Sequence, residues 1–153
     1  MDSILYRKAK VEDKLVLNNL FQKLLEYEKE FYDHNIKDDL SILSFFDNKI
    51  NDDNHIIFVA LDKDLIVGYI HCYIDYDNKI KKENEAEISS LYVVDEYRNK
   101  KISTKLINKL IEDLKNNDIK IVKVANFINN KYAKLLYEKL EFNVVQEKRQ
   151  LRI

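Results

Sequence analysis

The sequence contains no proline and one glycine, Gly68, among its 153 residues. Soluble domains average about 7% glycine and about 5% proline, so the two residue types that usually mark turns are almost missing. Asn, Lys, Ile and Tyr are abundant instead, and their codons are rich in A and T. We therefore suggest that the base composition of the gene removed the glycines; a G/C-rich gene would contradict this.

Cysteine is also scarce, and long apolar runs are absent. The single cysteine, Cys72, excludes an internal disulfide and fits a reducing, cytoplasmic setting. The N-terminal stretch "MDSILYRKAK" has no apolar run after a basic start, which argues against a signal peptide. No window approaches the roughly 18 apolar residues of a membrane span. We expect a cytoplasmic protein with no membrane partner.

Neither sign of charge is in excess. The chain has 26 Lys and Arg residues against 27 Asp and Glu residues, and the two signs are interleaved. A general nucleic-acid binder would normally carry a basic excess, so we expect no nucleic-acid partner. Three dispersed histidines, His34, His55 and His71, together with one cysteine lack the spacing of a metal site, and we expect no metal.

What the sequence does contain is enough apolar residues, 46% of the chain, to bury a core. We expect a single domain over residues 1–153. Hydrophobic periodicity predicts strands over 4–9, 55–61, 65–77, 86–94, 118–126 and 142–153, and helices over 12–32, 39–51, about 102–114 and about 130–140. Three consecutive strands predict hairpins, and the later strand–helix–strand step predicts a parallel pair. The expected sheet is mixed, with helices on its faces.

The stretch "LYVVDEYRNKKISTKLI" combines a strand end, a basic turn and the start of a helix. A helix that begins near Ile102 leaves its first amides without internal partners, and the helix dipole favours an anion there. Arg98, Lys100, Lys101 and Lys105 surround that point with positive charge. Two interpretations stay open: an anion site, for a group such as pyrophosphate, or basic residues that gathered by chance and cost some stability.

Two motifs resemble those of the GNAT acetyltransferase superfamily. The first is a strand ending in Leu-x-Val, followed by Arg/Gln-x-x-Gly-x-Gly/Ala at a helix start; here it reads "LYV" at 91–93 and "RNKKIS" at 98–103. The second, Asn-x-x-Ala-x-x-Leu-Tyr-x-Lys-x-Gly-Phe, is more specific and matches "NKYAKLLYEKLEF" at 130–142. The predicted element order also agrees over nearly the whole chain. The resemblance implies an α/β (α+β) GNAT fold with a mixed central sheet of about six to seven strands and about four helices.

The resemblance also implies acetyl-coenzyme A as co-substrate, held where two parallel strands splay apart. The backbone of Leu91, Tyr92 and Val93 would pair with the acetyl-pantetheine arm, and Asn130 would contact the coenzyme A arm. The pyrophosphate would lie near Arg98 on the amides of Asn99, Lys100, Lys101, Ile102, Ser103 and Thr104.

Tyr137 occupies the position of a general acid in many relatives. A phenol with an ordinary pKa of about 10 is protonated at neutral pH and can protonate a leaving thiolate. Plain packing within the helix is the alternative interpretation for Tyr137.

Three positions depart from the family pattern. Lys101 and Ser103 replace the two glycine positions of the first motif, and Glu141 replaces the glycine before Phe142. Lys101 is the most serious departure, because glycine lets backbone approach a phosphate without a Cβ in the way. A degenerate acyl-coenzyme A-binding sensor or interaction module therefore stays open beside an enzyme.

A base is expected on the strand that carries the first motif. Glu87 alternates onto the predicted face of Ser89, Leu91 and Val93, and some relatives use a glutamate on this strand. A solvated strand-end carboxylate is the alternative interpretation. His71, with an ordinary pKa near 6.5, is a weaker candidate for the base.

The acceptor is expected to be the primary amine of a small molecule or a peptide. In this family the segment that joins the first two helices usually walls the acceptor site, and here that segment, residues 26–39, is acidic and aromatic. Such a wall suits a cationic acceptor, such as a polyamine, an aminoglycoside-like amine or a peptide amine. A charged surface helix is the alternative. Many relatives dimerise through the C-terminal strand, so "QEKRQLRI" is a candidate edge for a homodimer.

Overall fold

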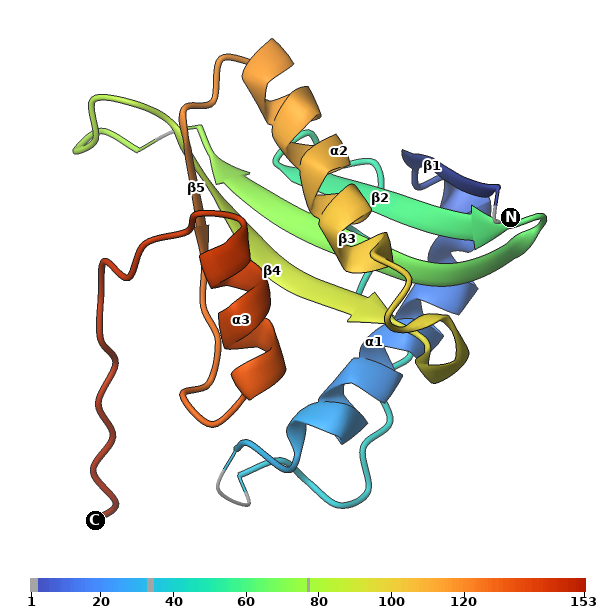
Figure 1. Ribbon diagram of the computed structural model, residues 1–153, viewed down its shortest axis with the longest axis horizontal. Helices are drawn as coiled ribbons and strands as arrows, with labels where there is room; N and C mark the ends of the chain where they lie inside the picture. The colour runs from blue at the N-terminus through green and yellow to red at the C-terminus, as the bar shows by residue number, and fades with distance from the viewer. Residues whose placement is uncertain (1–2, 33–34, 77) are drawn as a thin grey trace.

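The computed structural model describes residues 3–32, 35–76 and 78–153. These residues form a mixed sheet in the order β1-β2-β3-β4-β5, in which β4 and β5 are parallel and the other neighbours antiparallel (Figure 1). The strands are β1 (Ile4–Lys8), β2 (His55–Asp62), β3 (Leu65–Asp75), β4 (Glu85–Val93) and β5 (Ile121–Val124). The predicted hairpins and the predicted parallel pair are confirmed.

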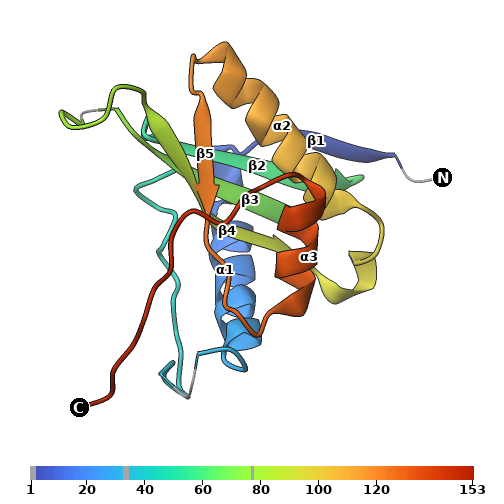
Figure 2. The same ribbon diagram turned by 60° about the vertical axis from the view of Figure 1, so that its left-hand side comes forward.

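Helices cover both faces of this sheet. One face carries α1 (Lys14–Glu28), and the other carries α2 (Ile102–Asn116) and α3 (Lys131–Lys139), as Figure 2 shows. Two short 3-10 turns, η1 (Val11–Asp13) and η2 (Asp95–Tyr97), precede α1 and α2. The helix α2 is the crossover between the parallel strands β4 and β5, as connections of this kind require.

The core has two parts, one on each side of the sheet. Under α2, the side chains of Leu106, Leu110 and Leu114 are buried against β2, β3 and β4. Under α1, Leu17 and Leu20 pack against the opposite face. Each fully buried leucine contributes about 1.5–3 kcal/mol, so these two stripes fix α1 and α2 on the sheet.

The predicted helix over 39–51 is wrong. The segment forms turns instead, although its apolar residues recur at helical spacing. The side chain of Asn18, buried on α1, bonds to backbone groups of this segment that a helix would have paired internally. Its Oδ1 accepts from the Phe46 amide at 2.8 Å, and its Nδ2 donates to the Leu43 carbonyl at 2.9 Å. Phe46 is fully buried while Leu43 is largely exposed. The segment is therefore held to the core by Phe46 and not by the row of apolar side chains that a helix would have buried.

The predicted strand over 142–153 is wrong as well. Residues 143–153 form no regular secondary structure and run away from the sheet (Figure 1). Apolar side chains along this segment, including Val144, Val145 and Leu151, are exposed. The described residues thus form five strands and three α-helices, in place of the expected six to seven strands and four helices. A homodimer through this segment stays a prediction.

The absences predicted from the sequence concern membranes and metals. Within the described part of the chain, no helix combines the length and the apolar character needed to cross a bilayer. The described residues also bring together no group of three His, Cys, Asp or Glu side chains suited to a metal ion. His34 lies outside the described residues, so the expectation that the chain binds no metal stays a prediction.

Gly68 is needed for the close packing of β3 against β4. A Cβ added there would meet the Tyr92 carbonyl oxygen at 3.0 Å and the Val93 Cγ2 at 3.2 Å. We expect Gly68→Ala to lower the free energy of unfolding by about 1–3 kcal/mol, and Gly68→Val to lower it further, because β4 must move away. Chemical denaturation measures this effect. Equal stability of wild type and Gly68→Ala would contradict it.

Candidate functional site

The strands β4 and β5 diverge after a short parallel ladder. They pair only between Glu85–Ile88 and Ile121–Val124, and the rest of β4 bends away (Figure 1). A cavity of about 350 Å³ opens in the gap. Its walls come from α1, β4, the start of α2, the residues after β5, and α3. The backbone of Leu91–Val93 faces this cavity with no strand on that side among the described residues.

A β-bulge in β4 decides which side chains face which layer. Ile88 pairs with Cys72 and Ser90 pairs with His71, so Ser89 is an extra residue between them. Leu91 and Ile88 therefore face the same helical layer, despite an odd separation along the strand. The alternation of side chains reverses at this point.

The expected position of Glu87 is therefore wrong. Glu87 lies on the face of Ser90 and Tyr92, opposite to Leu91 and Val93, because the bulge lies between them. Its side chain is exposed and does not line the cavity. The structure supports the solvated carboxylate that was the alternative interpretation.

His71 is buried away from the cavity. Its Nε2 lies 2.8 Å from the Nδ1 of His55, and the ring of Phe46 packs against it. Burial, with the nearby His55 and Lys49, lowers the pKa of His71 to about 3. A neutral imidazole enclosed in this way is a core residue, so His71 is not positioned to act as the base.

The turn before α2 keeps the backbone of a glycine-rich loop without its glycines. Lys101, at the first glycine position of the motif, has φ 63°, and Asn99 has φ 62°. Both values lie in the left-handed region that glycine adopts most readily. Ile102 and Ser103 follow directly and line the cavity. The first amides of α2 are therefore presented to the cavity as the motif requires, and they suit an anion.

The end of α3 shows the same preserved geometry. Glu141, at the glycine position of the second motif, has φ 68°. The Phe142 amide donates to the Tyr137 carbonyl at 2.9 Å, and the Glu141 amide donates to the Glu138 carbonyl at 3.0 Å. These two bonds form a Schellman cap. Lys101 and Glu141, each at a glycine position of one motif, thus both have the positive φ that glycine adopts most readily.

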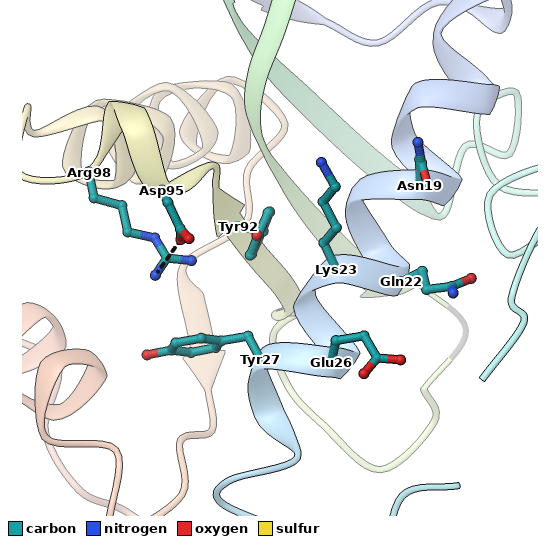
Figure 3. Close-up of a pocket in the computed structure, with 8 residues that line it drawn as sticks. All are labelled: Asn19, Gln22, Lys23, Glu26, Tyr27, Tyr92, Asp95 and Arg98. Carbon is teal, nitrogen blue, oxygen red and sulfur yellow. Dashed lines mark ion pairs between the residues drawn. The ribbon is translucent and has the colours of Figure 1, made fainter. Parts of the chain in front are cut away.

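Arg98 is held by protein groups rather than directed freely at an anion. Its Nε donates to the Val93 carbonyl at 3.0 Å, and its Nη1 forms an ion pair with Asp95 at 3.0 Å. Figure 3 shows the guanidinium lying over Tyr27 of α1, with the centre of the Tyr27 ring 4.9 Å from its Cζ. Arg98, Tyr27 and Tyr92 line both the main cavity and a second hollow of about 410 Å³ along α1. Arg98 therefore connects the turn before α2 to the helix α1, through its contact with Tyr27.

The other predicted cofactor residues divide into two groups. Asn99 and Asn130 line the cavity, whereas Lys100, Lys101 and Thr104 do not. Asn130 caps α3, because its Oδ1 accepts from the Ala133 amide at 3.1 Å. That hydrogen bond holds the Asn130 side chain at the N-terminal end of α3, which lies at the cavity.

Tyr137 lines the cavity from α3 and packs edge-on against Phe142, with ring centres 5.6 Å apart. Burial, with a smaller effect from the charge of Glu28, raises the pKa of Tyr137 to about 12. The phenol therefore keeps its proton over the whole physiological range. A half-buried, protonated phenol on a cavity wall can donate a proton to a bound group.

Sequence reasoning missed Glu28 as a separate site residue. It ends α1 and lines the same cavity as Tyr137, and burial raises its pKa. The helical spacing of the sequence could have indicated this residue, because Glu28 follows Leu20 and Leu24 at intervals of four residues. It therefore lies on the face of α1 that packs against the core. A carboxylate in such a stripe is unusual.

Lys101 offers a test of the turn's backbone. We expect Lys101→Gly to raise the free energy of unfolding by about 1 kcal/mol, because glycine relieves a left-handed conformation that lysine adopts with strain. Lys100→Gly is the matched control, since it removes the same charge from a residue without positive φ, and it should lower stability. Chemical denaturation compares the two variants. Equal stabilities would contradict the assignment.

The Acetyltransferase (GNAT) family profile matches residues 19–142, which is most of the chain. An uncharacterized N-acetyltransferase of Methanocaldococcus jannaschii is 36% identical over 76 residues, which are 50% of this chain. The aligned region spans only 34% of that relative.

Solved structures agree in fold. A tetramutant of a Bacillus halodurans protein superposes with a TM-score of 0.84 at 17% identity, covering 97% of this chain and 99% of that one. A predicted acetyltransferase from Clostridium acetobutylicum, solved with acetyl-CoA, gives 0.76 at 20% identity, covering 97% and 96%. An aminoglycoside acetyltransferase from an uncultured soil metagenomic sample, solved with sisomicin, gives 0.72 at 20% identity, covering 97% of each chain. The chain therefore belongs to the GNAT acetyltransferase family, as its two motifs predicted.

Proposed function

We propose that this protein is an acetyl-coenzyme A-dependent N-acetyltransferase that acts on a primary amine of a small molecule or a peptide. The observation that carries the proposal is the cavity between β4 and β5, which joins three groups of residues. They are the open backbone of Leu91–Val93, the first amides of α2, and the phenol of Tyr137. Family membership supports the same activity.

The residues fit acetyl-coenzyme A as a substrate. Backbone groups on an open strand edge can hydrogen-bond an extended amide-containing arm, as a neighbouring strand would. The amides after Lys101, in a turn with positive φ, can hold a pyrophosphate. Asn130 lies on the opposite wall, where it can contact the same arm. The preserved backbone of the turn favours an active enzyme over the degenerate sensor.

Acetyl transfer then follows by direct attack. The amine nitrogen bonds to the thioester carbonyl carbon, and amides of β4 can stabilise the oxyanion that forms. The C–S bond breaks, and Tyr137 gives its proton to the leaving thiolate. Holding both substrates in one cavity supplies much of the rate, because the reaction becomes effectively unimolecular.

The acceptor side of the cavity is aromatic. Phe127, after β5, stacks near Phe31 with ring centres 6.4 Å apart and meets Tyr32 edge-on at 4.3 Å. Tyr27 and Tyr132 also line the cavity. Aromatic faces attract cations, so this wall suits an amine that carries a positive charge. An aminoglycoside acetyltransferase of similar fold makes aminoglycosides a sensible member of the test panel.

Two measurements test the proposal. Acetyl-coenzyme A should raise the melting temperature, because a ligand of the native state stabilises it. Release of free thiol should then follow addition of an amine from a panel of polyamines, aminoglycosides and peptide amines. Binding without turnover on every amine would favour the sensor, and absence of binding would reject both roles.

A further inference from the structure

Glu28 is a carboxylate at a position where α1 otherwise buries leucines. Leu17, Leu20 and Leu24 are 7% exposed or less, and Glu28 continues their stripe at the end of the helix. Its backbone carbonyl accepts from the Phe31 amide at 2.9 Å, which closes the last turn. The helix thus directs this side chain toward the sheet, into the cavity between β4, β5 and α3.

Nothing in the described part of the chain neutralises this carboxylate. Glu28 forms no ion pair and no side-chain hydrogen bond with those residues, and burial raises its pKa. The neighbouring Glu26 differs, because it pairs with Lys29 at 2.8 Å and lines the second hollow along α1 (Figure 3). A half-buried carboxylate without a partner costs some stability, which points to a ligand that supplies the missing positive charge.

The titratable groups around Glu28 are phenols. Its charge raises the pKa values of Tyr69 on β3, Tyr137 on α3 and Tyr32 beyond α1, after the larger effect of burial on each. Arg98 lines the same cavity, but its guanidinium is paired with Asp95. The cavity therefore contains a carboxylate that can ionise and a phenol that stays protonated, and both face the same space.

We propose that Glu28 binds the ammonium group of the acceptor and removes its proton before acetyl transfer. The inference rests on the proposed function, and it names the residue that selects a cationic amine and activates it. It assigns to Glu28 the role of base that the sequence had placed on Glu87. Glu28 and Tyr137 line one cavity, whereas Glu87 lies outside it.

The protons balance in three steps. The ammonium gives one proton to the Glu28 carboxylate, which becomes a carboxylic acid and later releases that proton to solvent. The neutral amine forms the N–C bond, and the C–S bond breaks as Tyr137 protonates the sulfur. The Tyr137 phenolate then takes the second nitrogen-bound proton, which leaves one hydrogen on the amide product. No oxidant or metal is needed.

The test compares Glu28→Gln with wild type, using an amine from the panel that wild type acetylates. We expect kcat/KM to fall about 100-fold, as loss of a general base does, while the melting-temperature shift with acetyl-coenzyme A is unchanged. The acidic limb of the pH–rate profile should disappear. The melting temperature of the variant at pH 8 should equal or exceed that of wild type, because the change removes a half-buried charge that has no partner. Glu28→Asp should recover part of the activity.

A carboxylate on an exposed helical surface provides the control. Glu112→Gln, on α2 and away from the cavity, should leave turnover unchanged. Turnover by Glu28→Gln within twofold of wild type would overturn this inference and leave the proposed function standing. A parallel loss of melting temperature and turnover would also overturn it, since Glu28 would then be a structural residue. No acetyl transfer by wild type on any amine would overturn both proposals.

Discussion

Replacing Tyr137 by phenylalanine is expected to lower kcat by about 100- to 1000-fold while acetyl-coenzyme A binds as before. The change removes only the phenolic oxygen, so the ring still packs against Phe142 and the cap of α3 is kept. What is lost is the proton for the leaving thiolate. Thiol release measures kcat, and the shift in melting temperature measures binding.

The pH dependence of the Tyr137 step has a defined sign. A pKa raised to about 12 keeps the phenol protonated below that pH, so the rate should not fall between pH 8 and 10 through ionisation of Tyr137. Tyr76→Phe, at a partly exposed tyrosine outside the cavity, is the control and should keep wild-type kcat. If Tyr137→Phe retains more than a third of wild-type kcat, Tyr137 is a packing residue.

Acid should destabilise the protein through His71. The pKa of His71 is about 3 in the folded state and near 6.5 in an unfolded chain. Between these values the unfolded state binds a proton that the folded state excludes, so the free energy of unfolding falls as the pH falls. The slope approaches about 1.4 kcal/mol per pH unit. Burial also lowers the pKa of His55, which adds to the loss in the same direction.

Chemical denaturation between pH 8 and pH 4.5 measures this loss. A His71→Gln variant should be less stable than wild type at pH 8, because it disturbs the packing under Phe46, but its stability should depend less on pH. Wild type and variant with the same slope over this range would show that His71 titrates normally in the folded protein.

Local patterns predicted the parts of the site that depend on neighbours in sequence. The strand end at Leu91–Val93, the helix start at Ile102 and the helix expected from about residue 130 lie where the sequence placed them. These features follow from alternation, capping and helical spacing over a few residues. Lys101 adopts the positive φ of a glycine position, which costs lysine only about 1–2 kcal/mol.

Long-range contacts decided the rest. The helix expected over 39–51 was replaced by turns, because Asn18, more than 20 residues earlier, satisfies that segment's backbone. The segment 143–153 has the composition of a strand, but it pairs with none of the strands in the described part of the chain. Composition and periodicity carry no information about the availability of either partner.

The sequence by itself determined the family, the two motifs and the place of Tyr137, because each rests on residues close together in the chain. Only the tertiary structure decided which carboxylate lines the same cavity as Tyr137. The bulge at Ser89 places Glu87 on the other face of the sheet. The packing of α1 brings Glu28 into the cavity that Tyr137 lines, although the two residues are more than 100 positions apart in the sequence. Strand register and helix packing are set by the whole core, so no local pattern could have made that choice.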